Sequence, residues 1–74
     1  TGANLTAIGW RSLSSNTTGI ENTALGLNSL YTNTTGSYNT AVGQTALFLN
    51  STASYNTAFG FHSFSPYSNL TLYF

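Results

Sequence analysis

Apolar and small residues recur along the chain at a fixed spacing of 17 positions without gaps. Alanine stands at every seventeenth position from residue 7 and glycine from residue 9, and the column from residue 13 holds three leucines followed by a phenylalanine. These columns are Ala7, Ala24, Ala41 and Ala58; Gly9, Gly26, Gly43 and Gly60; and Leu13, Leu30, Leu47 and Phe64. A fixed internal period is typical of stacked repeat proteins. The chain is therefore predicted to consist of just over four copies of one unit.

The repeat reads G-x-x-N-T-A-φ-G-x-x-S-L-x-x-N-T-T, where φ is an apolar residue. A helical repeat needs roughly 33 residues for two packed helices, and Thr is a poor helix former. The unit instead suits one coil of an all-β parallel β-solenoid (a β-roll or β-helix) with 17-residue coils and two or three short strands per coil. We expect strands at N-T-A-φ and S-L-x-x, and a corner at N-T-T-G, where Asn and Gly tolerate left-handed backbone geometry.

Strand alternation leaves two assignments open for the outer face. Neighbouring strand residues point to opposite sides, so the Ala column and the next column cannot both line one core. That next column is Ile8, Leu25, Val42 and Phe59. Either way an apolar stripe faces outward, and a strand that is apolar on both faces suggests burial on both. We expect other copies of the chain to cover it, in a trimer or a head-to-tail filament, with Asn and Thr columns forming hydrogen-bond ladders.

The repeat pattern covers residues 1–65 and breaks near Pro66. Residues 66–74 are predicted to be a C-terminal cap, with a strand donated to a neighbouring subunit as the alternative. Leu70, Leu72 and Phe74 alternate as in a strand and join the outer column as candidate self-association residues. Because the chain begins at Thr1 without Met, we expect it to be processed or part of something longer.

The repeated segments carry a resemblance that covers roughly residues 2–65. They are Thr6–Gly9, Asn22–Gly26, Asn39–Gly43 and Asn56–Gly60, each followed by x-x-S/A-L or a close variant. This pattern resembles the head repeats of YadA-like trimeric autotransporter adhesins and, equally, the N-T-A-φ-G arrays of tail-fibre-type surface proteins. The resemblance implies a parallel β-roll, usually trimeric, on an extracellular stalk or fibre used for attachment.

Charge and composition remove most other functions. Charged residues are 3% of the chain, namely Arg11 and Glu21, and His62 is the one histidine. Nucleic-acid binding needs a basic surface, a disulfide scaffold needs cysteines, and carboxylate-based catalysis needs a second carboxylate. We therefore expect no enzyme activity, no cofactor and no metal, and we interpret His62 as a surface or interface residue rather than a metal ligand on a trimer axis. The longest apolar run, residues 46–49, is too short to span a membrane.

Two patterns are candidate sites for sugars. The five Asn-x-Ser/Thr sequons are candidate glycosylation sites, with corner and ladder roles as the alternative: Asn4, Asn16, Asn33, Asn50 and Asn69. Aromatic residues also share columns and are suited either to stacking on surface carbohydrate or to ladders within an interface: Tyr38 with Tyr55, Tyr31 with Phe48, and Trp10 with Phe61.

Together these features predict an extracellular structural protein. It is expected to be a self-assembling module of a secreted fibre, virion fibre or surface adhesin, carrying glycans if the sequons are used. The alternative is an ice-binding solenoid, since the chain holds 13 Thr and little charge. An ice-binding face generally needs Thr-x-Thr within one strand, and that spacing occurs here between Thr32 and Thr34.

Overall fold

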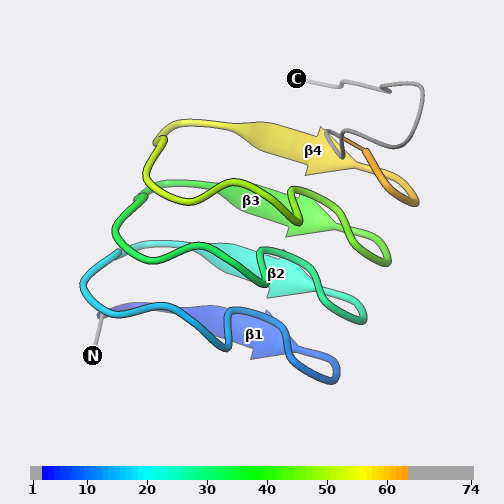
Figure 1. Ribbon diagram of the computed structural model, residues 1–74, viewed down its shortest axis with the longest axis horizontal. Coiled ribbons are helices and arrows are strands. Elements are labelled where there is room, and N and C mark those ends of the chain that lie inside the picture. Colours follow the sequence, from blue (N-terminus) through cyan, green and yellow to red (C-terminus); the bar gives the residue numbers. More distant parts are fainter. Residues whose placement is uncertain (1–2, 64–74) are drawn as a thin grey trace.

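The computed structural model describes residues 3–63, and within that range the chain is all-β, with four parallel strands in one sheet and no helix (Figure 1). The strands are β1 (Thr6–Ile8), β2 (Thr23–Leu25), β3 (Thr40–Val42) and β4 (Thr57–Phe59). They lie side by side in chain order, and each strand residue pairs with the residue 17 positions later, as Ala24 pairs with Ala41. This arrangement is consistent with a β-solenoid. Residues 66–74, with the predicted cap, lie outside the described residues.

Each repeat contains one strand of three residues, so the predicted second strand at S-L-x-x is wrong. The reason is the leucine of that segment, whose φ is 52° at Leu13 and 51° at Leu30. A left-handed residue interrupts an extended strand. The segment still connects adjacent repeats, because the N–H of Leu30 donates to the carbonyl oxygen of Ala46 at 3.0 Å.

The left-handed positions also differ from those predicted at the N-T-T-G corner. The Gly of that corner does not have a positive φ. It is required by space instead, since a Cβ at Gly36 would overlap the carbonyl oxygen of Ala53. Outside glycine, positive φ occurs in three columns, namely residues 4, 21, 38 and 55; 11, 28, 45 and 62; and 13, 30 and 47. The turns therefore repeat as regularly as the strands.

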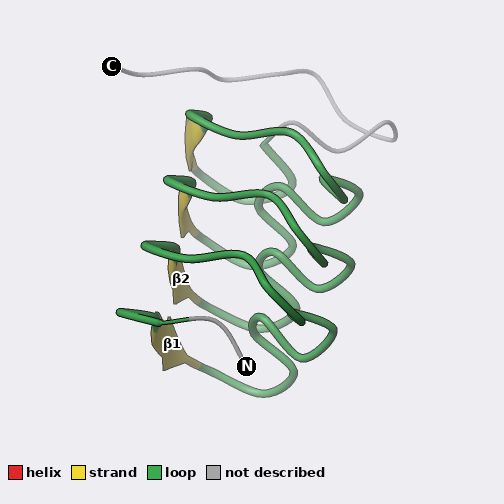
Figure 2. Ribbon diagram, turned by 90° about the vertical axis from the view of Figure 1, so that its left-hand side faces the viewer, coloured by secondary structure: helices red, strands yellow, loops and turns green. Residues whose placement is uncertain are grey.

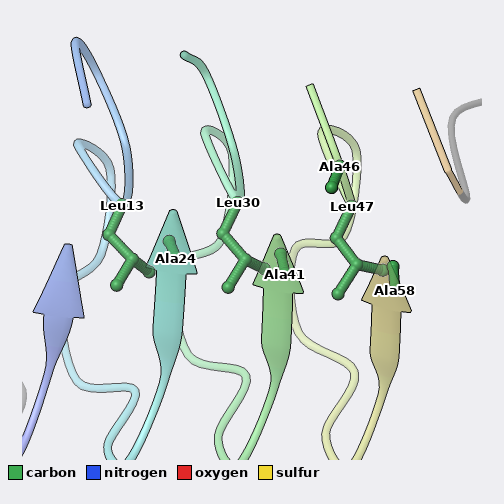
Figure 3. Packing of buried hydrophobic residues seen from close by; sticks show 7 residues of the cluster. All are labelled: Leu13, Ala24, Leu30, Ala41, Ala46, Leu47 and Ala58. Carbon is green, nitrogen blue, oxygen red and sulfur yellow. The ribbon is translucent and has the colours of Figure 1, made fainter. Parts of the chain in front are cut away.

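The core lies between the sheet and the turns that face it (Figure 2). Each leucine points toward the alanine of the next strand, so Leu30 lies beside Ala41 (Figure 3). The buried apolar residues are Leu13, Ala24, Leu30, Ala41, Ala46, Leu47 and Ala58. Of the two apolar columns of the strands, the Ala column therefore faces inward and the larger apolar column faces outward. Ala7, in the first described repeat, is exposed.

Asparagine ladders complete the interior, as the sequence predicts. Asn33 donates from Nδ2 to Oδ1 of Asn16 at 2.9 Å, and Asn50 donates to Oδ1 of Asn33 at 3.0 Å. A second column bonds to the backbone: Oδ1 of Asn22 accepts from the N–H of Asn39 at 2.9 Å, and Oδ1 of Asn39 accepts from Asn56 at the same distance. Burial of polar groups is tolerated here because they are hydrogen-bonded from repeat to repeat.

Candidate functional site

The outward column of the sheet forms a continuous apolar stripe. We use this name for Ile8, Leu25, Val42 and Phe59, which pair in register along the four strands. Ile8 is 60% exposed, Phe59 55% and Leu25 40%, while Val42 is half-buried. They face out because each follows the buried Ala, or Ala7 in β1, by one position. The sequence-predicted self-association residues of the strands are thus brought together, whereas Leu70, Leu72 and Phe74 lie outside the described residues.

The positions beside the stripe are also uncharged. The residues two positions after it are Trp10, Leu27, Gln44 and Phe61, and both aromatic members are about two-thirds exposed, at 68% and 66%. Contiguous exposed apolar surface is uncommon on monomeric proteins and marks a surface used for contact. On the other side of the stripe, the strand threonines form one outward column, so Thr6 pairs with Thr23.

Three of the candidate glycosylation sites, Asn16, Asn33 and Asn50, use their side-chain amides in hydrogen bonds of the ladder. Asn33 is fully buried, and its Nδ2 donates to both Asn16 and the carbonyl oxygen of Gly36. Nδ2 of Asn16 donates to the carbonyl oxygen of Gly19, and that of Asn50 to the carbonyl oxygen of Ala53. Because N-glycosylation modifies this same nitrogen, a glycan at Asn33 does not fit this fold. The geometry favours the ladder interpretation for this column.

The remaining sequons differ from the ladder column. Asn4 is exposed, and its Nδ2 donates to Oε2 of Glu21 at 2.9 Å. It is the candidate glycosylation site that the described fold leaves accessible. Asn69 lies outside the described residues. Glycosylation at these two sites stays a prediction.

Aromatic residues that share a column stack where they are adjacent. The rings of Tyr31 and Phe48 lie 5.3 Å apart at 9°, and those of Tyr38 and Tyr55 lie 5.0 Å apart at 4°. Both pairs stack within one chain, between equivalent turn positions of adjacent repeats, which is the ladder arrangement. Trp10 belongs to the same column as Phe61 but lies three repeats from it.

Sequence reasoning missed the surroundings of Arg11. Its Cζ lies 4.7 Å from the ring centroid of Trp10 and 5.1 Å from that of Tyr31. Tyr31 is 20 positions from Arg11, one repeat plus three residues, so a search within columns does not reveal the contact. Prediction of this contact requires the geometry of the turn in addition to the 17-residue period.

Other kinds of site find little support in the geometry. Within residues 3–63, no three His, Cys, Asp or Glu side chains gather as metal ligands do. His62 packs its ring against Phe61, with the centroids 4.0 Å apart. No helix of the described range is long and apolar enough to cross a membrane.

The chain finds no match among protein-family models, curated proteins or solved structures. The stripe and its surroundings are therefore the features from which a function is inferred.

Proposed function

We propose that this chain is a self-assembling structural module of an extracellular fibre or surface adhesin, built as a β-solenoid of 17-residue coils. The observation that supports the proposal best is the uncharged apolar stripe on the outer face of a parallel sheet. Parallel sheets are usually covered on both faces. One chain covers the inner face with its leucines and leaves the outer face to a second copy.

The exposed area of the stripe sets the strength of association. Full burial of an Ile, Leu or Phe side chain contributes about 1.5–3 kcal/mol. Ile8, Leu25 and Phe59 are roughly half exposed, so covering them contributes about 1 kcal/mol each. Two facing stripes give about 6 kcal/mol, which lies within the roughly 4–15 kcal/mol that association costs in lost freedom. The stripe alone supports weak, concentration-dependent association, and further contacts are needed for a stable fibre.

The exposed edge of β1 supplies such a contact. In the described part of the chain, β1 pairs with β2 alone, so its other edge has unpaired backbone groups. Ala7 is exposed there, whereas its counterparts in later repeats are fully buried. An open parallel edge is a template for a further strand. Lateral contact through the stripe and axial contact at this edge together build a fibre. Residues 66–74 then either cap the last module or donate a strand to this edge of the next one.

Sedimentation velocity over a wide concentration range tests the proposal. The wild-type chain is expected to shift from monomer to larger species as its concentration rises. The double variant Leu25→Lys/Phe59→Lys places two like charges on the stripe and is expected to stay monomeric. Thr35→Lys, which adds a charge at an exposed corner, is the control and is expected to associate like the wild type. A wild-type chain that stays monomeric throughout, or a double variant that associates equally well, contradicts the proposal.

The ice-binding alternative has a weaker geometric basis. The outer face holds one Thr column, and the neighbouring outward column is the apolar stripe. Two adjacent outward Thr columns are what the alternative requires. A thermal hysteresis measurement on the purified protein separates the two, because a freezing-point gap is expected from an ice binder and not from a fibre module.

A further inference from the structure

In the turn that follows β1, the side chain of Arg11 packs against two aromatic rings. Arg11 is the one Lys or Arg of the chain, and it is exposed. Its guanidinium lies over the rings of Trp10 and Tyr31, and Tyr31 in turn stacks on Phe48. Cation–π contacts of this kind fix the guanidinium without using its hydrogen-bond donors. The group is therefore positioned and still able to donate.

The donors of Arg11 have no partner within the described part of the chain. The one carboxylate side chain in the sequence is Glu21, whose Oε2 accepts from Asn4 at 2.9 Å. The described contacts of the Arg11 side chain are the two aromatic rings. A guanidinium carries five donors in a planar fork that matches a carboxylate. An anionic group from outside the chain is the complement of this isolated charge.

The backbone of this turn does not require an arginine. Arg11 has a φ of 65°, a left-handed value, and its counterparts Asn28, Thr45 and His62 share the conformation, with φ of 59°, 57° and 58°. The repeat therefore builds the same turn with four different side chains. The turn conformation does not account for a guanidinium at this position.

The exposed ring beside the cation narrows the class of ligand. Trp10 is 68% exposed, so it offers an apolar ring surface next to the guanidinium. Tyr31 extends the same platform. A polyphosphate or nucleic acid needs several cations, and this chain has one. A ring with an apolar face and one carboxylate, which is the structure of a uronic acid, uses both the indole and the guanidinium.

We propose that Arg11, Trp10 and Tyr31 bind an acidic saccharide, with the carboxylate of a uronic acid residue on the guanidinium of Arg11 and the sugar ring on Trp10. This inference rests on the attachment role in the proposed function and names its ligand class. It does not depend on self-association, since the site lies within one chain. Binding measured on an uncharged stripe variant, Leu25→Gln/Phe59→Gln, therefore separates failure of the saccharide site from failure of the assembly without adding cations.

Calorimetric titration of that variant with trigalacturonate tests the site, with methyl-esterified trigalacturonate as the matched neutral ligand. Hydrogen bonds to a charged group contribute about 1.5–3 kcal/mol, so esterification is expected to weaken binding roughly tenfold or more. Arg11→Gln is expected to weaken the binding of trigalacturonate by the same factor. The variant is then expected to bind the acid and its methyl ester with equal affinity. Trp10→Leu, which introduces the residue found at position 27, is expected to weaken the binding of both ligands by about the same factor.

A matched control removes an exposed aromatic residue elsewhere. Tyr55→Asn introduces the residue found at position 4 of the same column and is expected to bind trigalacturonate as before. Three outcomes overturn the proposal. They are a dissociation constant for the acid above roughly 10 mM, equal binding by Arg11→Gln, and equally effective competition by acetate, which would show a general anion contact rather than a saccharide site.

Discussion

Replacement of Asn22 by Ala tests whether the buried Asn column holds the repeats together. Asn22 is fully buried, and two of its hydrogen bonds connect it to buried residues. Its Nδ2 donates to the carbonyl oxygen of Gly36 at 2.8 Å, and its Oδ1 accepts from the N–H of Asn39 at 2.9 Å. In Asn22→Ala the N–H of Asn39 loses its partner, which costs about 1–3 kcal/mol, and the bond to Gly36 is lost at about 0.5–1.5 kcal/mol. The carbonyl oxygen of Gly36 keeps its hydrogen bond from Nδ2 of Asn33.

The expected loss is about 3 kcal/mol in the free energy of unfolding, the sum of the middle values for one orphaned N–H and one lost hydrogen bond. A chain of this length is stable by about 4–11 kcal/mol in total, so the variant is expected to lose a large fraction of its stability. Urea denaturation followed by circular dichroism measures the loss, at one fixed protein concentration because association also stabilises the fold.

Two matched variants show whether hydrogen bonding is the cause. Asn56→Ala removes one part-buried side-chain bond, from Nδ2 to Oδ1 of Asn50, and is expected to cost about 1 kcal/mol. Asn22→Leu restores the volume, with the residue found at position 5 of the same column, but leaves the N–H of Asn39 orphaned. The reasoning is refuted if Asn22→Leu recovers wild-type stability, or if Asn22→Ala costs no more than Asn56→Ala.

Two further predictions concern the backbone. A Cβ at Gly43 would lie 2.5 Å from the carbonyl oxygen of Gly60, whereas a Cβ at Gly60 meets no atom of residues 3–63 within 4 Å, although φ is similar, 130° and 131°. Gly60→Ala is therefore expected to cost about 1–3 kcal/mol from conformation alone and Gly43→Ala clearly more, as measured by thermal unfolding; equal losses would contradict a limit set by stacking distance. Thr45 is β-branched and has a φ of 57°, so Thr45→Asn, which introduces the residue at position 28, is expected to gain about 1 kcal/mol in the same assay. An unchanged or lower midpoint would show that no strain is stored there.

The period of the sequence was sufficient to predict the strands and their pairing. Every strand begins at the Thr of N-T-A-φ or its counterpart, and register follows from the 17-residue spacing, as with Thr23 and Thr40. The asparagine ladders were also predictable, because an amide can donate and accept along one column. Which apolar column faces inward was not predictable, since alternation alone fits both.

The turns and the surface contacts were less accessible to sequence reasoning. Leucine in a left-handed conformation, as at Leu30, is unfavourable for an isolated residue and is imposed by the packing of its side chain against Ala41. Local propensity therefore predicted a strand where the structure has a turn. The contact between Arg11 and Tyr31 crosses from one repeat to the next at a spacing that no column contains.

The pairing of each strand residue with its equivalent in the next repeat has a genetic consequence. Duplication or loss of one whole unit in the coding sequence replaces every interior contact by another of the same kind, because only adjacent layers touch. Loss of sixteen codons instead of seventeen would leave one coil a residue too long and break the register of pairing at the junction. Arrays of this design are thus free to lengthen and shorten over generations in whole steps, and selection can act on the number of repeats without redesigning their interior.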